Sequence, residues 1–367
     1  MENVKKERNY GIDLLRIVSM FMVVALHILG QGGMLNNLKP FTTNYNVAWF
    51  LEIAAYCAVN CYALISGYVS VESKYKYTNI IMIWLRVIFY TLGITGLFAI
   101  LAPDKVGISQ IIGAVFPIIT KQYWYVTSYF FLFFFIPYLN HIVNTMDKEQ
   151  LKKLLITILI AMSILPSIVL TDTFENYTGY SALWLGALYI FGAYVKKYGF
   201  FEKLKTKTWF VIYFISIVLA FISKVALEGI TLKIFGKILY GNLFVSYTSP
   251  LILLSGLALL MAFKNLKINK LKKSISFFSD LAFSVYIIHV NKLIWRNIFR
   301  NAFVFMTMKT SVVIFFGVLL SAILVFIACI IIDIPRHYLF KWIKLKEKVQ
   351  KLENKVMTKL NKKSEKI

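Results

Sequence analysis

Apolar runs of about twenty residues recur along the whole chain, and they restrict its fold more than any other feature of the sequence. Hydrophobic residues make up 59% of the 367 positions, and the mean hydropathy is +0.69. A transmembrane helix needs roughly 20 mostly apolar residues, whereas a soluble domain could not bury this much apolar surface. The sequence therefore predicts an all-α membrane protein embedded in the lipid bilayer.

Hydropathy windows of this length predict ten transmembrane helices. The predicted spans lie near residues 11–31, 46–69, 79–102, 122–143, 152–170, 179–195, 208–226, 240–263, 277–297 and 310–333. The segment Ile108–Thr120 is apolar but too short to cross a bilayer, which indicates a re-entrant or interfacial segment. The last span is expected to stop at Asp333-Ile-Pro335, because proline interrupts helical hydrogen bonding.

The distribution of basic residues predicts how these spans are oriented. Of the 41 lysines and arginines, 29 fall at the N-terminus, in alternate connecting segments and in the C-terminal tail, and ten fall on the opposite side. Cytoplasmic segments carry such an excess, so both termini are predicted to be cytoplasmic. We expect a multi-pass protein of the cell membrane. Orientation and lipid contact, not nucleic-acid binding, then account for the net charge of +24.

The C-terminal segment, residues 341–367, is rich in lysine. Apolar residues recur in it at nearly helical spacing, at Leu345, Val349, Leu352 and Val356. This pattern predicts a short basic amphipathic helix held at anionic lipid, although a solvated charged tail accounts for the composition equally well. The chain is therefore divided into a membrane domain, residues 1–340, and a basic cytoplasmic tail, residues 341–367.

The first predicted span contains three ionisable residues, Asp13, Arg16 and His27. Each such group costs about 2.5–3.5 kcal/mol at the centre of a membrane, so it usually marks a functional site. Arg16 and His27 are separated by close to three helical turns, which places them on one helix face about 16 Å apart along the axis. Asp13 lies one turn before Arg16 and is expected to pair with it. This face suits a long anionic substrate that reaches a buried base.

Other spans supply the remaining candidates. Arg86 lies inside the third span, where it can add a second cation to an anion site. A group that orients His27 must come from another span, because Asp13 is about 21 Å away along the helix. The candidates for this group are Glu52, Asn60, Ser66, Tyr125 and Ser128. Ser66 also precedes a glycine, and close helix packing explains that pair equally well.

Aromatic and further histidine residues complete the set. Trp124 and Tyr125 begin the fourth span, where interfacial aromatic residues are common, although aromatic faces also bind sugars. His289 lies within the ninth span, whereas His141 and His337 lie near span ends and are typical of interfacial anchors. Cys57 and Cys61 share a helix face, but no nearby histidine or carboxylate completes a metal set, so no metal site is predicted.

Taken in order along the chain, these motifs resemble those of the integral-membrane acyltransferase family 3. The resemblance begins with Gly11-Ile-Asp13-Leu-Leu-Arg16 and His27, and it covers about residues 8–336. It continues through Asn60–Tyr68, Trp124-Tyr125, Ser284–His289 and Asp333-Ile-Pro335. Members of this family are O-acyltransferases, typically with ten spans.

The resemblance implies a membrane-bound transfer of an acetyl or other acyl group. The donor would be cytoplasmic acetyl-CoA or another acyl-CoA, acting as a co-substrate and not as a bound cofactor. The acceptor would be a hydroxyl of a surface polysaccharide or a lipid-linked sugar. His27 matches the family's catalytic histidine, and Arg16 matches its essential arginine near the CoA.

The remaining candidates are assigned around this pair. Arg86 and Asp13 join Arg16 as cofactor-binding candidates. The acceptor or second-shell candidates are Ser66, Trp124, Tyr125 and His289. The family often carries two arginines spaced i, i+3 at the third span, but here Ile83 stands three residues before Arg86. Lys74 or Lys76 is expected to supply the missing charge.

Two other functions are compatible with ten spans that contain an internal arginine and histidine. A secondary transporter would show inverted repeats and broken helices at matching positions, and the sequence shows neither. A polysaccharide flippase or polymerase would handle similar lipid-linked sugars, usually with longer external loops or a longer chain. An acyltransferase without a soluble delivery domain is expected to acylate its acceptor directly or through an envelope-biosynthesis partner protein.

Overall fold

The computed structural model describes residues 8–172 and 174–364, and every regular element within these ranges is a helix. The longer helices are α1 (Tyr10–Leu29), α3 (Thr43–Tyr56), α4 (Ala58–Ser70), α5 (Tyr77–Leu101), α7 (Trp124–Thr145), α8 (Lys148–Leu159), α10 (Ala182–Tyr198), α11 (Thr206–Phe235), α12 (Pro250–Lys264), α13 (Lys272–His289), α15 (Ser311–Trp342) and α16 (Leu345–Ser364). The short ones are α2 (Met34–Asn37), η1 (Pro103–Lys105), α6 (Ile108–Val115), η2 (Ile160–Ile164), α9 (Leu165–Val169), η3 (Tyr177–Gly179), α14 (Lys292–Ile294), η4 (Trp295–Phe299) and η5 (Val304–Met308).

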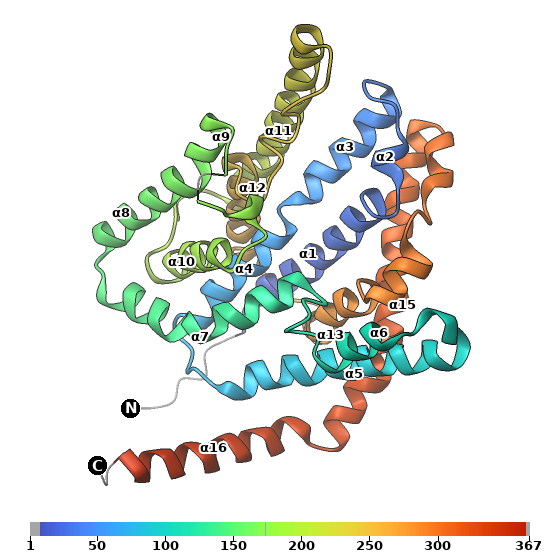
Figure 1. Ribbon diagram of the computed structural model, residues 1–367. Coiled ribbons are helices and arrows are strands. Elements are labelled where there is room, and N and C mark those ends of the chain that lie inside the picture. Colours follow the sequence, from blue (N-terminus) through green and yellow to red (C-terminus); the bar gives the residue numbers. More distant parts are fainter. Residues whose placement is uncertain (1–7, 173, 365–367) are drawn as a thin grey trace.

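The first helix, α1, runs through the middle of the bundle (Figure 1). It packs against α3, α4, α12, α13 and α15, which come from both halves of the chain. Its apolar residues Leu15, Val24 and Ile28 are completely buried. A helix with buried residues on most of its circumference is a core helix, so the ionisable residues of α1 lie inside the protein and do not face lipid.

Seven helical segments in the described part of the chain are long and apolar enough to cross a membrane. An eighth is obtained if α13 and the segment after it, which are bent by 52° relative to each other, are counted as one span. Each of the ten predicted spans falls on a helix. However, α10 has 17 residues and α12 has 15, so both are shorter than a straight span requires. The protein is thus a multi-pass helical membrane protein, and the count of ten stays a prediction.

Three predicted spans differ from the observed helices. The predicted span 240–263 is helical only from Pro250, where proline occupies the first helical turn and residues 241–248 form turns. The predicted span 277–297 breaks after His289. The predicted stop at Asp333-Ile-Pro335 is wrong, because α15 continues through Pro335 to Trp342. Proline removes one backbone hydrogen bond, whereas Asp333 and Arg336 pair across the same turn and hold it helical.

Glycines allow α4 and α10 to approach at backbone distance. A Cβ added at Gly67 would lie 1.9 Å from the carbonyl oxygen of Tyr189, and one added at Gly192 would lie 2.0 Å from that of Leu64. Helices in membranes associate closely where small residues face each other. The Ser66-Gly67 pair therefore has a packing role on its glycine side, which leaves the serine to be explained separately.

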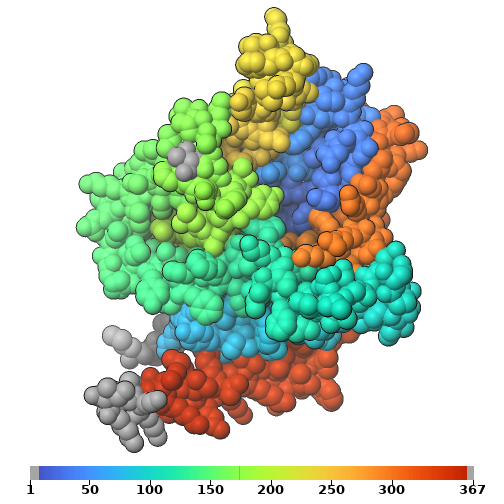
Figure 2. Space-filling model, viewed as in Figure 1, coloured from blue at the N-terminus to red at the C-terminus, as the bar shows by residue number. Residues whose placement is uncertain are grey.

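The predicted tail helix is present as α16, which lies along α5 (Figures 1 and 2). A carboxylate fixes this contact: Glu353 accepts hydrogen bonds from the backbone N–H groups of Tyr77 and Thr78, 2.7 and 3.0 Å away, and from the Thr78 hydroxyl. These N–H groups belong to the first turn of α5, where an anion is favourable. The tail therefore docks onto the bundle through the N-terminus of a transmembrane helix.

Candidate active site

Two adjoining cavities surround the functional candidates on α1. The first, which we call the histidine cavity, has a volume of about 850 Å³, counted with the space at its mouth that is open to solvent, and is lined by His27. The second, which we call the basic cavity, has a volume of about 2040 Å³ on the same basis and is lined by Arg16. The two residues that share one face of α1 are therefore divided between two cavities, as their separation along the helix requires.

A second histidine orients the His27 ring. Nδ1 of His27 lies 2.8 Å from Nε2 of His289, and Nδ1 of His289 lies 2.5 Å from the carbonyl oxygen of Val285. A carbonyl oxygen can only accept, so Nδ1 of His289 carries a proton. In the neutral His289 tautomer, Nε2 is then an acceptor, and Nδ1 of His27 donates to it. His27 is thereby left with a lone pair on Nε2, which is the form that a general base requires.

The bend after α13 builds the wall behind this histidine pair. His289 is the last residue of α13 and is 98% buried, with 2% of its surface exposed. The chain then turns, so that Trp295 of η4 meets the His27 ring edge-on at 4.9 Å between centroids. Trp295 in turn stacks on Phe299, whose ring contacts His289 at 5.7 Å. Aromatic packing on both rings restricts their rotation and preserves the hydrogen-bond chain.

The basic cavity gathers cations from four helices and the connection between α15 and α16. Its positively charged lining residues are Arg16, Arg86, Arg336, Lys341, Lys344 and Lys346. Asp280 and Glu347 are the acidic residues of this lining within the described ranges. Such an excess of guanidinium and ammonium groups around a large cavity is suited to a polyanion such as a set of phosphates.

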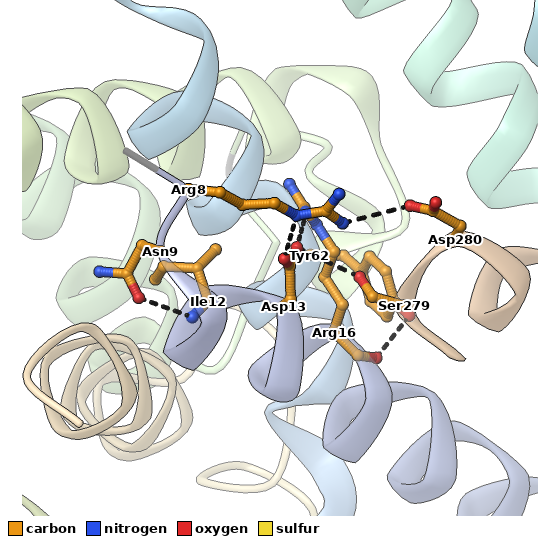
Figure 3. Close-up of polar contacts among 8 residues, drawn as sticks. All are labelled: Arg8, Asn9, Ile12, Asp13, Arg16, Tyr62, Ser279 and Asp280. Carbon is orange, nitrogen blue, oxygen red and sulfur yellow. Dashed lines mark hydrogen bonds and ion pairs between the residues drawn. The ribbon is translucent and has the colours of Figure 1, made fainter. Parts of the chain in front are cut away.

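At the α1 end of this cavity, Asp13 holds two arginines in place (Figure 3). Its Oδ1 accepts from Arg16 at 2.7 Å and its Oδ2 from Arg8 at 2.5 Å, and Ser279 donates to Oδ1 at 3.3 Å. Asp13 is 98% buried, whereas the Arg16 side chain is 29% exposed. The predicted Asp13–Arg16 pair is therefore confirmed. The carboxylate is occupied by protein groups, so it positions Arg16 and leaves the guanidinium available to the cavity.

A second arginine cluster lies between α5 and α15. Arg336 forms a bidentate pair with Asp333 at 2.7 and 2.8 Å, and the Tyr90 hydroxyl donates to the same carboxylate at 2.6 Å. Arg86 donates to the carbonyl oxygen of Asp280 at 3.2 Å, and its buried Nε has no hydrogen-bond partner. A buried donor without a partner is costly, so Arg86 is a site prepared for an external acceptor.

The two cavities share three lining residues, Tyr62, Tyr125 and Phe283. Tyr62 is fixed by a hydrogen bond from its hydroxyl to the Arg16 carbonyl oxygen at 2.8 Å. The Tyr62 and Tyr125 rings contact each other at 6.3 Å between centroids. These three aromatic side chains form the boundary at which a molecule in the basic cavity would meet the histidine cavity.

The structure brings most of the predicted residues to one of these cavities. His27, Trp124 and Tyr125 line the histidine cavity, and Arg16, Arg86 and Ser66 line the basic cavity. The group that orients His27 is His289, not one of the five candidates Glu52, Asn60, Ser66, Tyr125 and Ser128. Asn60 instead binds the carbonyl oxygen of Tyr247 at 2.9 Å, and the Ser66 hydroxyl binds that of Tyr62 at 2.9 Å.

The additional cations of the basic cavity were not assigned to the site by sequence reasoning. Lys74 and Lys76 were expected to replace the missing arginine at position 83, but the lining carries Arg336 and the lysines of the α15–α16 segment. Arg336 follows directly on Asp333-Ile-Pro335, so its position next to a motif was the available signal. The tail lysines carried no such signal, because their contact with the site depends on how α16 docks.

A comparison with protein-family models assigns the chain to a family. The acyltransferase domain of acyltransferase family 3 matches residues 9–332, which is nearly the whole chain. No curated protein and no solved structure shows significant similarity to the chain. The matched region includes the lining of both cavities except for the residues of the basic cavity from Arg336 onward. The chain therefore belongs to the integral-membrane acyltransferase family 3.

Proposed function

We propose that this acyltransferase moves an acyl group, in the first instance acetyl, from cytoplasmic acyl-CoA to a hydroxyl of a cell-envelope glycan or lipid-linked sugar. The observation that carries this proposal is the contact between the two cavities. A cation-lined cavity that suits the phosphates of CoA adjoins, across three aromatic side chains, a cavity that contains an oriented histidine.

In this proposal the donor lies in the basic cavity. The phosphates of CoA contact Arg16 and Arg86, with Arg336 and the tail lysines as further cations. The unpartnered Nε of Arg86 and the partly exposed guanidinium of Arg16 supply the hydrogen bonds. The pantetheine arm extends along the face of α1, and the thioester reaches His27 past Tyr62, Tyr125 and Phe283.

The proposed reaction has one acid–base residue. Nε2 of His27 removes the proton of the acceptor hydroxyl, and the oxygen attacks the thioester carbonyl carbon. The tetrahedral intermediate collapses with cleavage of the carbon–sulfur bond, and His27 returns the proton to the CoA thiolate. The products are an ester and free CoA. The hydrogen bond from Nδ1 of His27 to His289 keeps the ring in the reactive orientation throughout.

The membrane arrangement belongs to the same proposal. We infer ten spans, with both termini and the basic cavity on the cytoplasmic side of the cell membrane. The excess of basic residues on that side supports this orientation. The basic cavity is lined by the lysines of the α15–α16 segment, which belongs to the C-terminal part of the chain that we infer to be cytoplasmic. A donor from the cytoplasm could therefore reach this cavity. The acceptor then enters the histidine cavity from the other side, directly or delivered by a partner protein.

Transfer of radiolabelled acetyl from acetyl-CoA tests the proposal. Membranes with the wild type should label a glycan or lipid-linked sugar fraction, and His27→Ala should reduce labelling by at least about 100-fold, the usual contribution of a general base. His141→Ala is the matched control, because His141 lies on the exposed end of α7 and outside both cavities. Undiminished transfer in a folded His27→Ala protein would overturn the mechanism. No labelling with any acyl-CoA would favour a transporter.

A further inference from the structure

Glu52 of α3 is a buried carboxylate that the proposed reaction does not use. It is 92% buried, with 8% of its surface exposed, and it lines the histidine cavity. Its Oε2 atom is buried and has no hydrogen-bond partner in the protein. Buried polar atoms nearly always have a partner, and an unpartnered one in a cavity indicates a group supplied from outside.

The buried ion pair of α11 near this cavity does not satisfy the Glu52 side chain. Lys224 of α11 donates to Glu228, and its Nζ atom lies over the Trp49 ring, 3.4 Å from the ring centroid. Lys224 also donates to the Asn242 side chain at 3.3 Å. The hydrogen bonds of Lys224 thus go to other residues, and Glu52 keeps hydrogen-bonding capacity toward the cavity.

Four aromatic rings stand beside Glu52 in the same cavity. Tyr56, Trp124, Tyr180 and Tyr247 line it and contact one another. Centroid distances are 4.8 Å for Tyr56–Tyr247, 4.6 Å for Trp124–Tyr180 and 5.0 Å for Tyr180–Tyr247. They come from α3, α7 and two turns, so the fold assembles this cluster from distant parts of the sequence. Mutually packed rings present rigid apolar faces with hydroxyl groups at their edges.

The charges around this cavity restrict what can occupy it. Within the described part of the chain, its lining contains no lysine or arginine, and Glu52 is its one acidic residue. An anionic ligand would have no cation in this lining to pair with, and its charge would be buried among aromatic rings, which is costly. A neutral sugar ring with several hydroxyl groups fits this lining. Its apolar face can pack on the aromatic rings, and its hydroxyl groups can donate hydrogen bonds to Glu52.

We propose that Glu52 and the aromatic cluster of Tyr56, Trp124, Tyr180 and Tyr247 form the acceptor subsite, which binds one neutral pyranose ring and discriminates against acidic sugars. One ring hydroxyl donates to the Glu52 carboxylate, while another faces His27 in the same cavity. The inference rests on the proposed function, because it identifies the class of sugar that the same active site acylates.

Binding of methyl glycosides tests the subsite without acyl transfer. The full-length protein in lipid nanodiscs is mixed with methyl β-D-glucopyranoside or methyl β-D-glucuronide, and saturation-transfer NMR gives the dissociation constant of each. The wild type should bind the neutral glycoside at least about tenfold more tightly than the acidic one. Glu52→Leu should weaken binding of the neutral glycoside by about tenfold, which corresponds to the loss of one hydrogen bond.

Two further variants keep the test decisive. Glu52→Gln retains a carbonyl acceptor at the same position, so it should weaken binding of the neutral glycoside much less than Glu52→Leu does. Glu149→Gln changes an exposed carboxylate of α8 that pairs with Lys152 and should leave both constants unchanged. Because Glu52 Oε2 has no partner in the protein, its removal leaves no other group unsatisfied, and the variants are expected to fold.

The outcomes separate this inference from the proposed function. The subsite is overturned if the wild type binds neither glycoside, if it binds both equally, or if Glu52→Leu binds the neutral glycoside as well as the wild type does. Acetyl-CoA binding by the same nanodiscs is measured in parallel and should not change in the Glu52 variants. Selective glycoside binding without any acyl transfer would instead retain the subsite and overturn the proposed reaction.

Discussion

The basic cavity and the histidine cavity meet at Tyr62, Tyr125 and Phe283, yet their other residues have little in common. The basic cavity carries six arginines and lysines, whereas the described lining of the histidine cavity carries none. Both are built on α1, with Arg16 in one and His27 in the other. Under the proposed function, this difference would separate the two substrates by charge, with the anionic donor on one side of the aromatic boundary and a neutral acceptor on the other.

The cavities also differ in how their key groups are fixed. His27 depends on one hydrogen-bond chain through His289 to the backbone of Val285. In the basic cavity, Asp13 holds Arg16 and Asp333 holds Arg336, and the six cations of the lining partly duplicate one another. Single substitutions should therefore affect catalysis steeply on the histidine side and affinity gradually on the basic side.

The largest effect is expected from breaking the chain behind His27. In His289→Phe, Nδ1 of His27 loses its acceptor and the ring loses its preferred tautomer, so kcat should fall roughly 100-fold. The KM for acyl-CoA should stay within about twofold, because the basic cavity is untouched. Initial rates over a range of acetyl-CoA concentrations measure both quantities. His141→Phe is the control, and a rise in KM without a fall in kcat would contradict the role assigned to His289.

A smaller effect is expected from removing one well-placed cation. Arg16→Gln should raise the KM for acyl-CoA by about 10-fold and leave kcat within a few-fold, because a charge-assisted hydrogen bond to phosphate is lost. Asp13 keeps its bonds to Arg8 and Ser279, so the start of α1 should remain folded. The matched control is Arg300→Gln, an exposed arginine outside both cavities. Equal KM values in the two variants would contradict a donor site at Arg16.

Part of the site and of the fold could be predicted from the sequence, and part depends on tertiary contacts. Arg16, Arg86 and His27 were identifiable because charge inside an apolar run is visible without a structure. The Asp13–Arg16 pair followed from helical periodicity alone. In the fold, helix positions followed from hydropathy, but the turns at 241–248, the bend after His289 and the continuation of α15 past Pro335 depend on tertiary contacts.

Partnerships between distant helices could not be read from the sequence. His289 was a candidate by residue type, but its bond to His27 depends on how α13 packs against α1. From the sequence, Glu52 is a candidate only for orienting His27, and its unpartnered oxygen follows from the packing of α3. Tyr180 and Tyr247 lie in turns whose sequences resemble ordinary connections. Residues that act through neighbours remote in sequence are those that sequence patterns reveal least.

The smallest effect concerns the tail, which contributes to the basic cavity but not to the histidine cavity. Burial acts to raise the pKa of Glu353, but the hydrogen bonds from Thr78 and Tyr77 and the nearby Lys76 outweigh it and hold this pKa below its usual value. A carboxylate with a lowered pKa stabilises the docked state above the ordinary glutamate pKa, and this contribution is lost as the pH falls through the lowered value. Undocking of α16 at acidic pH should therefore remove cations from the donor site alone.

The substitution Glu353→Gln tests the docking of α16 without a change of pH. The variant retains one acceptor oxygen but loses the charge at the N-terminus of α5, so docking should weaken only modestly. Hydrogen exchange of the α16 amides at neutral pH should be severalfold faster than in the wild type, and the KM for acyl-CoA should rise about twofold with kcat and glycoside binding unchanged. The control is Glu347→Gln. Glu347 lines the basic cavity but does not cap α5, so this substitution should not accelerate hydrogen exchange of the α16 amides. If exchange is faster while the KM for acyl-CoA is constant, the tail is a separate unit, as the predicted domain boundary after residue 340 implies. If the KM rises together with the exchange rate, the donor site includes the tail.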